Sequence, residues 1–161
     1  MKLGTRGRYA VMAMAELAMR TGGASEAEPV TLAEIAARQD ISQSYLEQLF
    51  GRLRRAGLVR SARGPGGGYR LARPAAELTI ADIVLAVDEN LRATRCPPGS
   101  GKGCMRDERR CVTHDLWEEL GTHIRDFLDA VSLEDVCARR LPGMSGRLSG
   151  GGRGLMEQAA E

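Results

Sequence analysis

The run of glycine and proline at residues 64–68 constrains the fold more than any other part of this chain. It reads Gly-Pro-Gly-Gly-Gly, which the interior of a helix or strand does not tolerate. Residues 58–62 before it and 69–72 after it have the length and apolar content of short strands. The sequence therefore predicts a β-hairpin with a glycine-rich turn. A phosphate-cradling nucleotide loop is the alternative, but the helix with Lys and Ser or Thr that a P-loop requires does not follow.

Three helices are expected before this hairpin. Apolar periodicity indicates a mostly buried helix at about 5–20. Residues 31–34 have the spacing of a capping box, which opens a second, short helix. After a tight turn, either Ser42 or Ser44 caps a third helix at about 43–56. The predicted core stripe of this third helix is Leu46, Leu49, Phe50 and Leu53.

Positive charge gathers in and beside the predicted hairpin. The 161 residues have a net charge of +2, yet residues 52–73 contain seven arginines and no acidic side chain. Such a local excess is typical of proteins that bind nucleic acids, whereas a solvated face usually mixes both signs. Two short helices joined by a tight turn form the arrangement in which the second helix enters a major groove. We therefore expect a mainly α fold with a small β-hairpin wing, a winged helix-turn-helix that binds double-stranded DNA.

The second half of the chain holds metal-binding residue types in a segment that cannot fold by itself. Residues 92–113 are polar, rich in Gly and Pro and without apolar periodicity, so they cannot form a packed core. The ligands offered in and directly after this segment are Cys96, Cys104, Cys111 and His114. Three thiolates and an imidazole suit zinc or an iron-sulfur cluster, and either would supply the missing constraint. Cys137 stands apart, and we expect it to be a small buried apolar residue.

The cysteines also bear on where the protein works. A secreted chain would use them in disulfides, but Glu16 interrupts the N-terminal apolar run that a signal peptide needs. No segment approaches the roughly 20 consecutive apolar residues of a membrane span. We therefore expect a cytoplasmic protein with no membrane partner, in a reducing compartment where clustered cysteines more often bind metal than pair.

A long amphipathic helix, capped by Thr113, is expected after the cysteine segment. Its apolar stripe holds Leu116, Leu120, Ile124, Phe127 and Val131, with Trp117 and Leu128 beside it. A shorter helix at about 80–88 precedes the segment, and another at about 132–138 follows the long one. The stripe can pack on the protein's own first helix or on the same helix of a second subunit. We favour a homodimer, because major-groove readers commonly match a two-fold operator with a two-fold protein.

Several stretches of the chain together resemble the Rrf2-type bacterial transcription regulators. They are residues 1–3 (Met-Lys-Leu), 7–11 (Gly-Arg-Tyr-Ala-Val), 41–50 (Ile-Ser to Leu-Phe) and 63–69, which include the glycine-rich turn. In the second half, Ala93-Thr94-Arg95-Cys96 and Thr113-His114 are similar to the members of that family that carry an iron-sulfur cluster. The resemblance covers about residues 1–137 and leaves only the C-terminal tail outside.

This resemblance implies a homodimeric repressor that holds a [2Fe-2S] cluster and controls its own iron-sulfur cluster assembly operon, with the assembly machinery as the donor of the cluster. The positions that match the ligands are Cys96, Cys104, Cys111 and His114. The intervals between them are seven, six and two residues, so the loop is slightly longer than in the best-known pattern. Because one imidazole is a weaker ligand than a thiolate, such a cluster is easier to lose, which suits a gauge of cluster supply.

The resemblance also implies which side chains contact DNA. The matching positions are Ser42, Ser44, Tyr45, Glu47, Gln48, Arg54, Arg63 and Gly64. Arg63 stands at the entrance of the glycine-rich turn, where an arginine can enter a narrow minor groove. Glu47 would discriminate between classes of site, because phosphate repels a carboxylate unless it is reoriented or meets a cytosine amino group.

Three predicted parts follow. Residues 1–75 form a winged helix-turn-helix DNA-binding domain, and residues 76–140 carry the cluster-binding loop and the dimerisation helices. Residues 141–161 are rich in glycine and are expected to be a disordered tail.

Other readings of the ligand set stay open. A nitric-oxide-sensing or redox-sensing repressor of the same family shares the fold and three cysteines, but its pattern has an acidic ligand near the position of Arg8 and lacks the match to His114. A zinc-stabilised repressor would use the same three cysteines and histidine. An electron carrier or thiol enzyme leaves the arginine-rich segment and the wing unexplained. We find no catalytic dyad, and we expect no enzyme.

Overall fold

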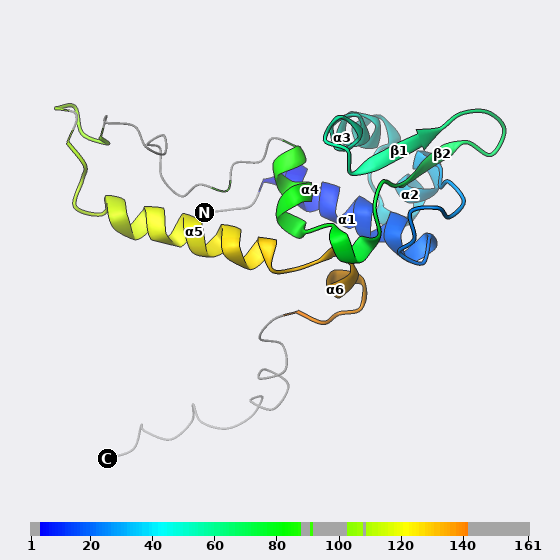
Figure 1. The fold of residues 1–161 in the computed structure, drawn as a ribbon. Coiled ribbons are helices and arrows are strands. Elements are labelled where there is room, and N and C mark those ends of the chain that lie inside the picture. The colour runs from blue at the N-terminus through cyan, green and yellow to red at the C-terminus, as the bar shows by residue number, and fades with distance from the viewer. Residues whose placement is uncertain (1–3, 88–90, 92–102, 108, 142–161) are drawn as a thin grey trace, which may run out of the picture.

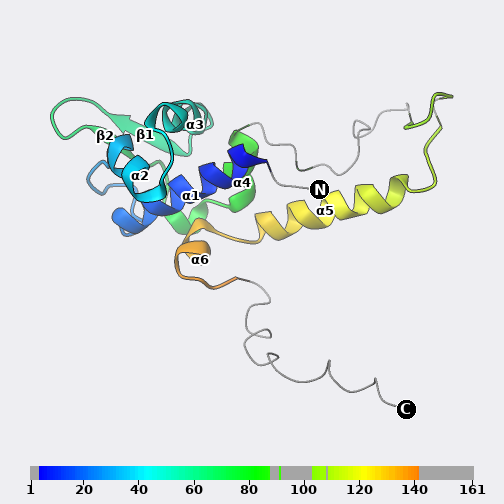
Figure 2. The same cartoon turned by 180° about the vertical axis from the view of Figure 1, so that it is seen from behind.

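The computed structural model describes residues 4–87, 91, 103–107 and 109–141 of the chain. Its elements, in chain order, are α1 (Thr5–Arg20), α2 (Leu32–Gln39), α3 (Gln43–Arg55), β1 (Val59–Ala62), β2 (Gly68–Leu71), the 3-10 helix η1 (Ala75–Glu77), α4 (Ile80–Ala86), α5 (His114–Asp129) and α6 (Leu133–Cys137). Helices α1 to α4 and α6 gather with the hairpin into one body, and α5 projects from that body (Figures 1 and 2). The mainly α fold with a small hairpin agrees with the prediction.

Helix α1 runs through the body and contacts α2, α3, α4 and α6. Its bounds are those expected, and most of its residues are buried or half-buried. Glu16 is buried in this helix, with 4% of its surface exposed. The Gln39 amide donates a hydrogen bond of 2.9 Å to its carboxylate, which removes the cost of burying an unpaired charge.

Side-chain caps set the starts of the two helices that follow. Thr31 and Glu34 form the predicted capping box at α2. At α3 the cap is Ser42, whose Oγ accepts a 3.4 Å hydrogen bond from the Tyr45 backbone. Ser44 therefore lies inside the first turn of α3. Asp40 adopts a left-handed conformation with φ of 52°, which closes the tight turn between the two helices.

The core stripe of α3 is buried as predicted. At most 1% of the surface is exposed for each of Leu46, Leu49, Phe50 and Leu53. The ring of Phe50 meets that of Tyr69 edge to face, with 4.9 Å between centroids. Burying each large apolar side chain contributes about 1.5–3 kcal/mol, so this stripe holds α3 against α1 and the hairpin.

The hairpin pairs β1 and β2 antiparallel, from Val59 opposite Leu71 to Ala62 opposite Gly68. A further bridge joins it to the chain before α2, because Tyr69 and Val30 exchange two backbone hydrogen bonds of 2.8 Å. At Gly68 a Cβ atom would collide with the Val30 carbonyl. The predicted hairpin is therefore confirmed, and glycine at position 68 lets the wing lie against the start of the helix-turn-helix.

The segments around α4 and α6 close the body. Thr79 and Asp82 form a capping box at α4, and Ser132 and Asp135 form another at α6. A short bridge pairs Thr79 with Ser132, so the two helix starts lie side by side. The apolar residues Leu78, Val131 and Leu133 belong to the same core as α1 and α3.

Helix α5 differs from the prediction at both ends. Thr113 occupies the position before the first turn, but within the described chain its side chain makes no capping hydrogen bond to α5. The helix ends at Asp129, so Val131 does not extend its stripe. The Val131 carbonyl instead accepts a 2.9 Å hydrogen bond from the Ile80 backbone, which requires the chain to leave the helix.

The apolar stripe of α5 is largely uncovered. The exposed fractions are 61% for Leu116, 43% for Trp117, 38% for Leu120 and 48% for Phe127. Packing on α1, the alternative to pairing with a second subunit, therefore does not cover this stripe. Among the helices that the structure describes, none is both long enough and apolar enough to cross a membrane. Residues 142–161 of the predicted disordered tail lie outside the described residues.

Candidate metal centre and nucleic-acid interface

A tight turn brings the two ends of the segment 103–111 together. The Met105 backbone donates a 3.0 Å hydrogen bond to the Arg109 carbonyl, and a Cβ at Gly103 would collide with the Arg109 backbone. Asp107 accepts hydrogen bonds from the Arg109 side chain at 2.6 Å and its backbone at 3.2 Å. These bonds, the side-chain one above all, hold the pKa of the Asp107 carboxyl below its usual value. The residues on either side of the turn, Cys104 and Cys111, consequently come close.

Two cysteines and the histidine of the predicted ligand set meet at this turn. The Cys111 backbone donates a 3.4 Å hydrogen bond to Cys104 Sγ, and the same sulfur lies 3.2 Å from His114 Nδ1. His114 is 4% exposed, although the rest of the first turn of α5 is exposed. Its backbone also donates to the Cys111 carbonyl at 3.0 Å. Cys96, the remaining predicted ligand, lies outside the described residues.

This donor set fits a metal centre. Two ligands of one tetrahedral metal, sulfur at about 2.3 Å and nitrogen at about 2.1 Å, lie roughly 3.6 Å apart. The observed separation of 3.2 Å between Cys104 Sγ and His114 Nδ1 is within a few tenths of an ångström of that value. The Thr113 hydroxyl lies 3.5 Å from Cys111 Sγ, and the Thr113 backbone, with ψ of 6°, is not in the extended conformation of a capping residue. Thiolates with one imidazole suit both zinc and iron-sulfur clusters, so the geometry leaves both open.

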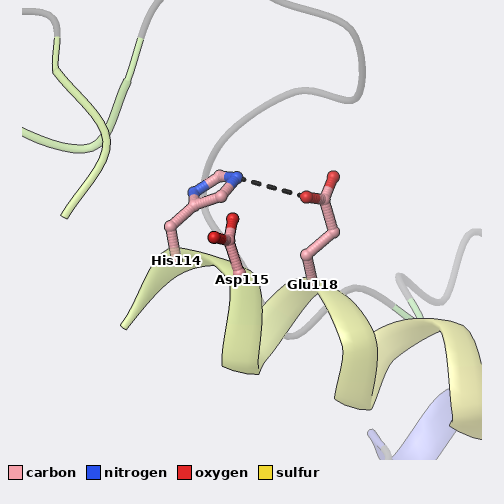
Figure 3. A group of neighbouring side chains, drawn as sticks. All are labelled: His114, Asp115 and Glu118. Atoms are coloured by element: carbon pink, nitrogen blue, oxygen red, sulfur yellow. Dashed lines mark ion pairs between the residues drawn. The ribbon is translucent and has the colours of Figure 1, made fainter. Parts of the chain in front are cut away.

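Carboxylates surround the other side of the histidine. Figure 3 shows His114, Asp115 and Glu118 on the first turns of α5, with the histidine ring turned toward Glu118. His114 Nε2 lies 3.4 Å from Glu118 Oε2, and ligand atoms of all three residues lie within 4.8 Å of one another. These two carboxylates are not among the ligands predicted from the sequence. The spacing of His114 and Glu118, four residues apart on a helix, is the signal that could have found them.

Cys137 lies in α6, apart from this group. It is half-buried, and its Sγ donates a weak 3.7 Å hydrogen bond to the Ala15 carbonyl of α1. Burial raises the pKa of the Cys137 thiol, which favours its protonated form and lowers its reactivity.

The predicted DNA-contact residues of the helix-turn-helix lie on one exposed stretch of α3. Ser42, Ser44, Glu47 and Gln48 are exposed, and Glu47 accepts a 3.2 Å hydrogen bond from the Gln43 side chain. Tyr45 is half-buried, with its ring edge to face against Tyr9 at 5.9 Å. Tyr45 can therefore offer its hydroxyl while its ring helps to hold α3 on α1.

The remaining predicted contacts lie at the end of α3 and on the wing. The Arg54 guanidinium lies 3.5 Å from Ser61 Oγ, so it spans from α3 to β1. Arg63 and Gly64 are exposed in the turn between the strands, where Gly64 has φ of 93°. Figures 1 and 2 both show this turn extending away from the body, at the far end of the hairpin from α3. An exposed helix and an exposed turn on one body suit a major groove and a neighbouring minor groove.

Comparison with known proteins places this arrangement among transcriptional regulators. The Rrf2 family, described as an iron-dependent transcriptional regulator, matches residues 3–139. The HTH-type transcriptional regulator IscR of Vibrio campbellii is 50% identical over 136 residues, which cover 84% of this chain and 77% of that protein. Such relatives confirm a regulator over an electron carrier or an enzyme.

Two solved structures share the fold. IscR of T. potens superposes with a TM-score of 0.67 at 36% identity, over 86% of this chain and 88% of that one. CymR, the global cysteine regulator of B. subtilis, superposes with a TM-score of 0.69 at 31% identity, over 86% of this chain and 98% of that one. Both matches confirm the predicted winged helix.

Proposed function

The chain belongs to the Rrf2 family of transcriptional regulators, and from this membership and the cysteine–histidine group we propose that it senses iron-sulfur clusters. It binds a [2Fe-2S] cluster through Cys96, Cys104, Cys111 and His114. With the cluster bound, the protein represses the operon that encodes the cluster assembly machinery, and that machinery donates the cluster.

The observation that carries this proposal is the contact between Cys104 and His114. A histidine that is 4% exposed turns Nδ1 toward a cysteine sulfur 3.2 Å away, while the backbone of a second cysteine donates to that sulfur. A histidine that served only the start of the helix would not be expected to contact two cysteines. An imidazole in a set of thiolates makes the bound group easier to release, which a gauge of cluster supply requires.

Helix α4 provides the connection between this site and the DNA-binding residues. Residues 1–75 bind DNA, and residues 76–140 carry the ligands and the dimerisation helices. Helix α4 contacts α3, the recognition helix, and the chain after it keeps Val87 and Leu91 in the core. The chain is thus held in the core as far as Leu91, before the ligand-bearing segment begins. When the ligands bind the cluster, that segment becomes ordered and shifts the equilibrium between two orientations of α3. Loss of the cluster returns the protein to the other orientation.

DNA recognition uses the exposed side chains of α3 and the wing. Ser42, Ser44, Tyr45, Gln48 and Arg54 position α3 in the major groove, and Arg63 and Gly64 place the wing turn at phosphate and the minor groove. Glu47 selects between classes of site, because its carboxylate is tolerated only where a base amino group donates a hydrogen bond to it.

A second copy of the chain covers the apolar face of α5. Leu116, Trp117, Leu120 and Phe127 are exposed on this helix, and their burial in a dimer is favourable at about 25 cal/mol per Å². The resulting two-fold protein matches a two-fold operator, and the proposed site of action is the cytoplasm.

Anaerobic purification of the full chain tests the cluster directly. We expect a coloured protein with visible absorbance and with iron and sulfide in equal amounts. Cys104→Ala and Cys111→Ala should lose this absorbance, whereas the matched variant Cys137→Ala should keep it. A colourless protein that contains zinc would refute cluster sensing and favour a zinc-stabilised repressor.

Binding to a promoter fragment of the assembly operon tests the regulation. We expect the cluster-loaded protein to bind more tightly than the apoprotein in gel-shift titrations. Arg63→Ala should weaken binding and lower the slope of log affinity against log salt by about 1, whereas Arg125→Ala on α5 should not. Equal affinity of the loaded and apo forms would contradict the proposed switch.

A further inference from the structure

His114 is held between a sulfur and a carboxylate. Its Nδ1 lies 3.2 Å from Cys104 Sγ, and its Nε2 lies 3.4 Å from Glu118 Oε2. Figure 3 shows the Glu118 side chain rising from the next turn of α5 toward the ring. The two nitrogens of His114 therefore face groups of different chemistry, and only the one at the sulfur faces the proposed ligand set.

We propose that Glu118 is the positioning residue of His114, an inference that rests on the proposed cluster site. A carboxylate only accepts hydrogen bonds, so Glu118 favours the tautomer of His114 that carries its proton on Nε2. The lone pair of Nδ1 is then directed at the position of the cluster. Metal-bound histidines commonly donate their other N–H to a carboxylate in this way, which fixes the ring and strengthens the ligand.

The contact is longer than a good hydrogen bond, which spans about 2.7–3.2 Å. Glu118 is 49% exposed, whereas His114 is 5% exposed at the side chain, so the carboxylate is the partner able to move. Turning its side-chain torsions closes the remaining gap without a shift of α5. The relation of residues i and i+4 places both side chains on one face of the helix throughout.

Glu118 also reaches the segment that carries the second cysteine. Arg110 Nη1 lies 4.0 Å from Glu118 Oε2 and 3.8 Å from Asp115 Oδ1, and Arg110 directly precedes Cys111. One carboxylate thus faces both the imidazole ligand and the residue next to a thiolate ligand. Its removal loosens two ligand-bearing segments at once.

A divalent cation is the competing occupant of His114, Asp115 and Glu118. Their ligand atoms lie within 4.8 Å of one another, which is close enough for one ion. The Arg110 guanidinium, however, already lies against both carboxylates and would repel such an ion. His114 also directs its other nitrogen at Cys104, so the carboxylates serve the histidine and not a separate metal.

The two histidines of the chain provide a matched control. His123 lies on the same helix, with its Nδ1 3.4 Å from Glu119 Oε1, and both partners are 70% exposed. Glu119→Ala removes the same charge from the same helix, one residue further along, without touching the proposed ligand set. Glu118→Ala and Glu119→Ala therefore differ in which imidazole loses its carboxylate.

The first measurement is the rate at which the full-length, cluster-loaded protein loses visible absorbance to an excess of iron chelator without oxygen. We expect Glu118→Ala to accelerate this loss about 10–100-fold, the usual effect of removing an outer partner of a metal ligand. Glu118→Gln keeps a hydrogen-bond acceptor, so its rate of cluster loss should lie between those of Glu118→Ala and the wild type. Glu119→Ala should stay within about twofold of the wild type, because its imidazole partner, His123, is not one of the proposed ligands. Equal rates for Glu118→Ala and the wild type, or equal acceleration by both alanine variants, would overturn the proposal.

The second measurement reads the tautomer in the full-length apoprotein, from long-range proton–nitrogen NMR spectra of the neutral rings. We expect the Nε2–H form to dominate at His114 and to lose population in Glu118→Ala, with no change at His123. An unchanged tautomer would refute the role of Glu118 even if the cluster were lost faster. A wild-type protein that holds no cluster would instead refute the proposed function, so the two failures are distinguishable.

Discussion

The body, which contains α3, buries its large apolar side chains, whereas the projecting helix α5 exposes several of its own. In the body, Leu46, Leu49 and Phe50 are at most 1% exposed, whereas Leu116 and Phe127 on α5 are 61% and 48% exposed. The body therefore owes its fold to its own core. The stripe of α5 contributes little while it faces water, and its burial requires another surface.

The helix starts differ in the same way. Helices α2, α3, α4 and α6 each begin at a Ser or Thr whose side chain accepts a backbone hydrogen bond. Among the described residues, Thr113 makes no such bond at α5, and its hydroxyl lies beside Cys111 instead. A cap contributes about 1 kcal/mol, so α5 gives up stability where its first turn meets the proposed ligands. The predicted DNA-binding part is therefore the more stable one, and the start of α5, at the proposed ligands, is the less stable one.

The largest difference is expected between the two phenylalanines of the chain, one in each region. Phe50→Ala should lower the free energy of unfolding by about 3–5 kcal/mol, because it empties a fully buried site. Phe127→Ala should cost less than about 1 kcal/mol in the monomer, because the ring is already half exposed. Denaturant unfolding of the apoprotein measures both.

Sedimentation at several protein concentrations distinguishes an effect on dimerisation from an effect on the fold. Phe127→Ala should shift the monomer–dimer equilibrium toward monomer in sedimentation experiments, and the milder Phe50→Leu should leave it unchanged. Equal losses of unfolding free energy at positions 50 and 127 would show that α5 packs as tightly as the body.

Two glycines at close backbone contacts give the next largest effect. Gly68→Ala forces a Cβ against the Val30 carbonyl and should lower the free energy of unfolding by about 1–3 kcal/mol. Gly103→Ala forces a Cβ against the Arg109 backbone. It should leave the free energy of unfolding of the apoprotein nearly unchanged and lower the cluster content of the protein as purified without oxygen. Gly51→Ala is the control, because its Cβ meets open space and should stabilise α3 by about 0.5–1 kcal/mol. Normal cluster content in Gly103→Ala would mean that the turn does not position Cys104.

Thiol reactivity should also differ between the body and the segment before α5. Cys104 is exposed, whereas burial raises the pKa of the Cys137 thiol. Because the thiolate is the nucleophile, iodoacetamide at pH 8 should label Cys104 of the apoprotein several-fold faster than Cys137, as read by peptide mass mapping. Loading the cluster should protect Cys104 and leave the rate at Cys137 unchanged. Equal labelling of both in the folded apoprotein would be the opposite result.

The smallest effect concerns acid stability. The Thr31 backbone hydrogen bond, above all, holds the pKa of Glu34 below 4.5, and the Ser132 side chain does the same for Asp135 below 3.8. The folded state therefore binds fewer protons than the unfolded state. The stabilisation is present above these ordinary values and is lost as the pH falls through the lower folded ones.

Melting temperatures between about pH 5 and pH 2 check this sign. Glu34→Gln together with Asp135→Asn should flatten the fall of the melting temperature in acid. Asp107→Asn should flatten it less, because the partner that lowers the pKa of Asp107 is Arg109, within the same short turn. A steeper fall in the double variant would contradict the assignment of these carboxylates as caps.

The body could be predicted from sequence because its signals are local. The capping box at Thr31, the apolar stripe from Leu46 to Leu53 and the glycine-rich turn each act within a few residues. The end of α5 could not be predicted from sequence, because Val131 leaves the helix to pair with Ile80, about 50 positions earlier in the chain. Thr113 fails as a cap because its backbone, with ψ of 6°, is not in the extended conformation that a capping residue adopts. The meeting of Cys104, Cys111 and His114 could be expected from their residue types, whereas the approach of Glu118 to His114 needed the helix to be in place.

The bridge between Thr79 and Ser132 has a consequence for how such a regulator can change over evolutionary time. Ser132 directly follows Val131, and both Val131 and Leu91 belong to the core, so the chain between Leu91 and Val131 is a loop whose two ends are fixed on that core. The entropy of closing a loop grows only with the logarithm of its length, about 0.6 kcal/mol for each doubling. Extra residues between the cysteines therefore cost the fold almost nothing. We therefore expect that the proposed ligands in this loop can be respaced or replaced while the predicted DNA-binding helices keep their packing.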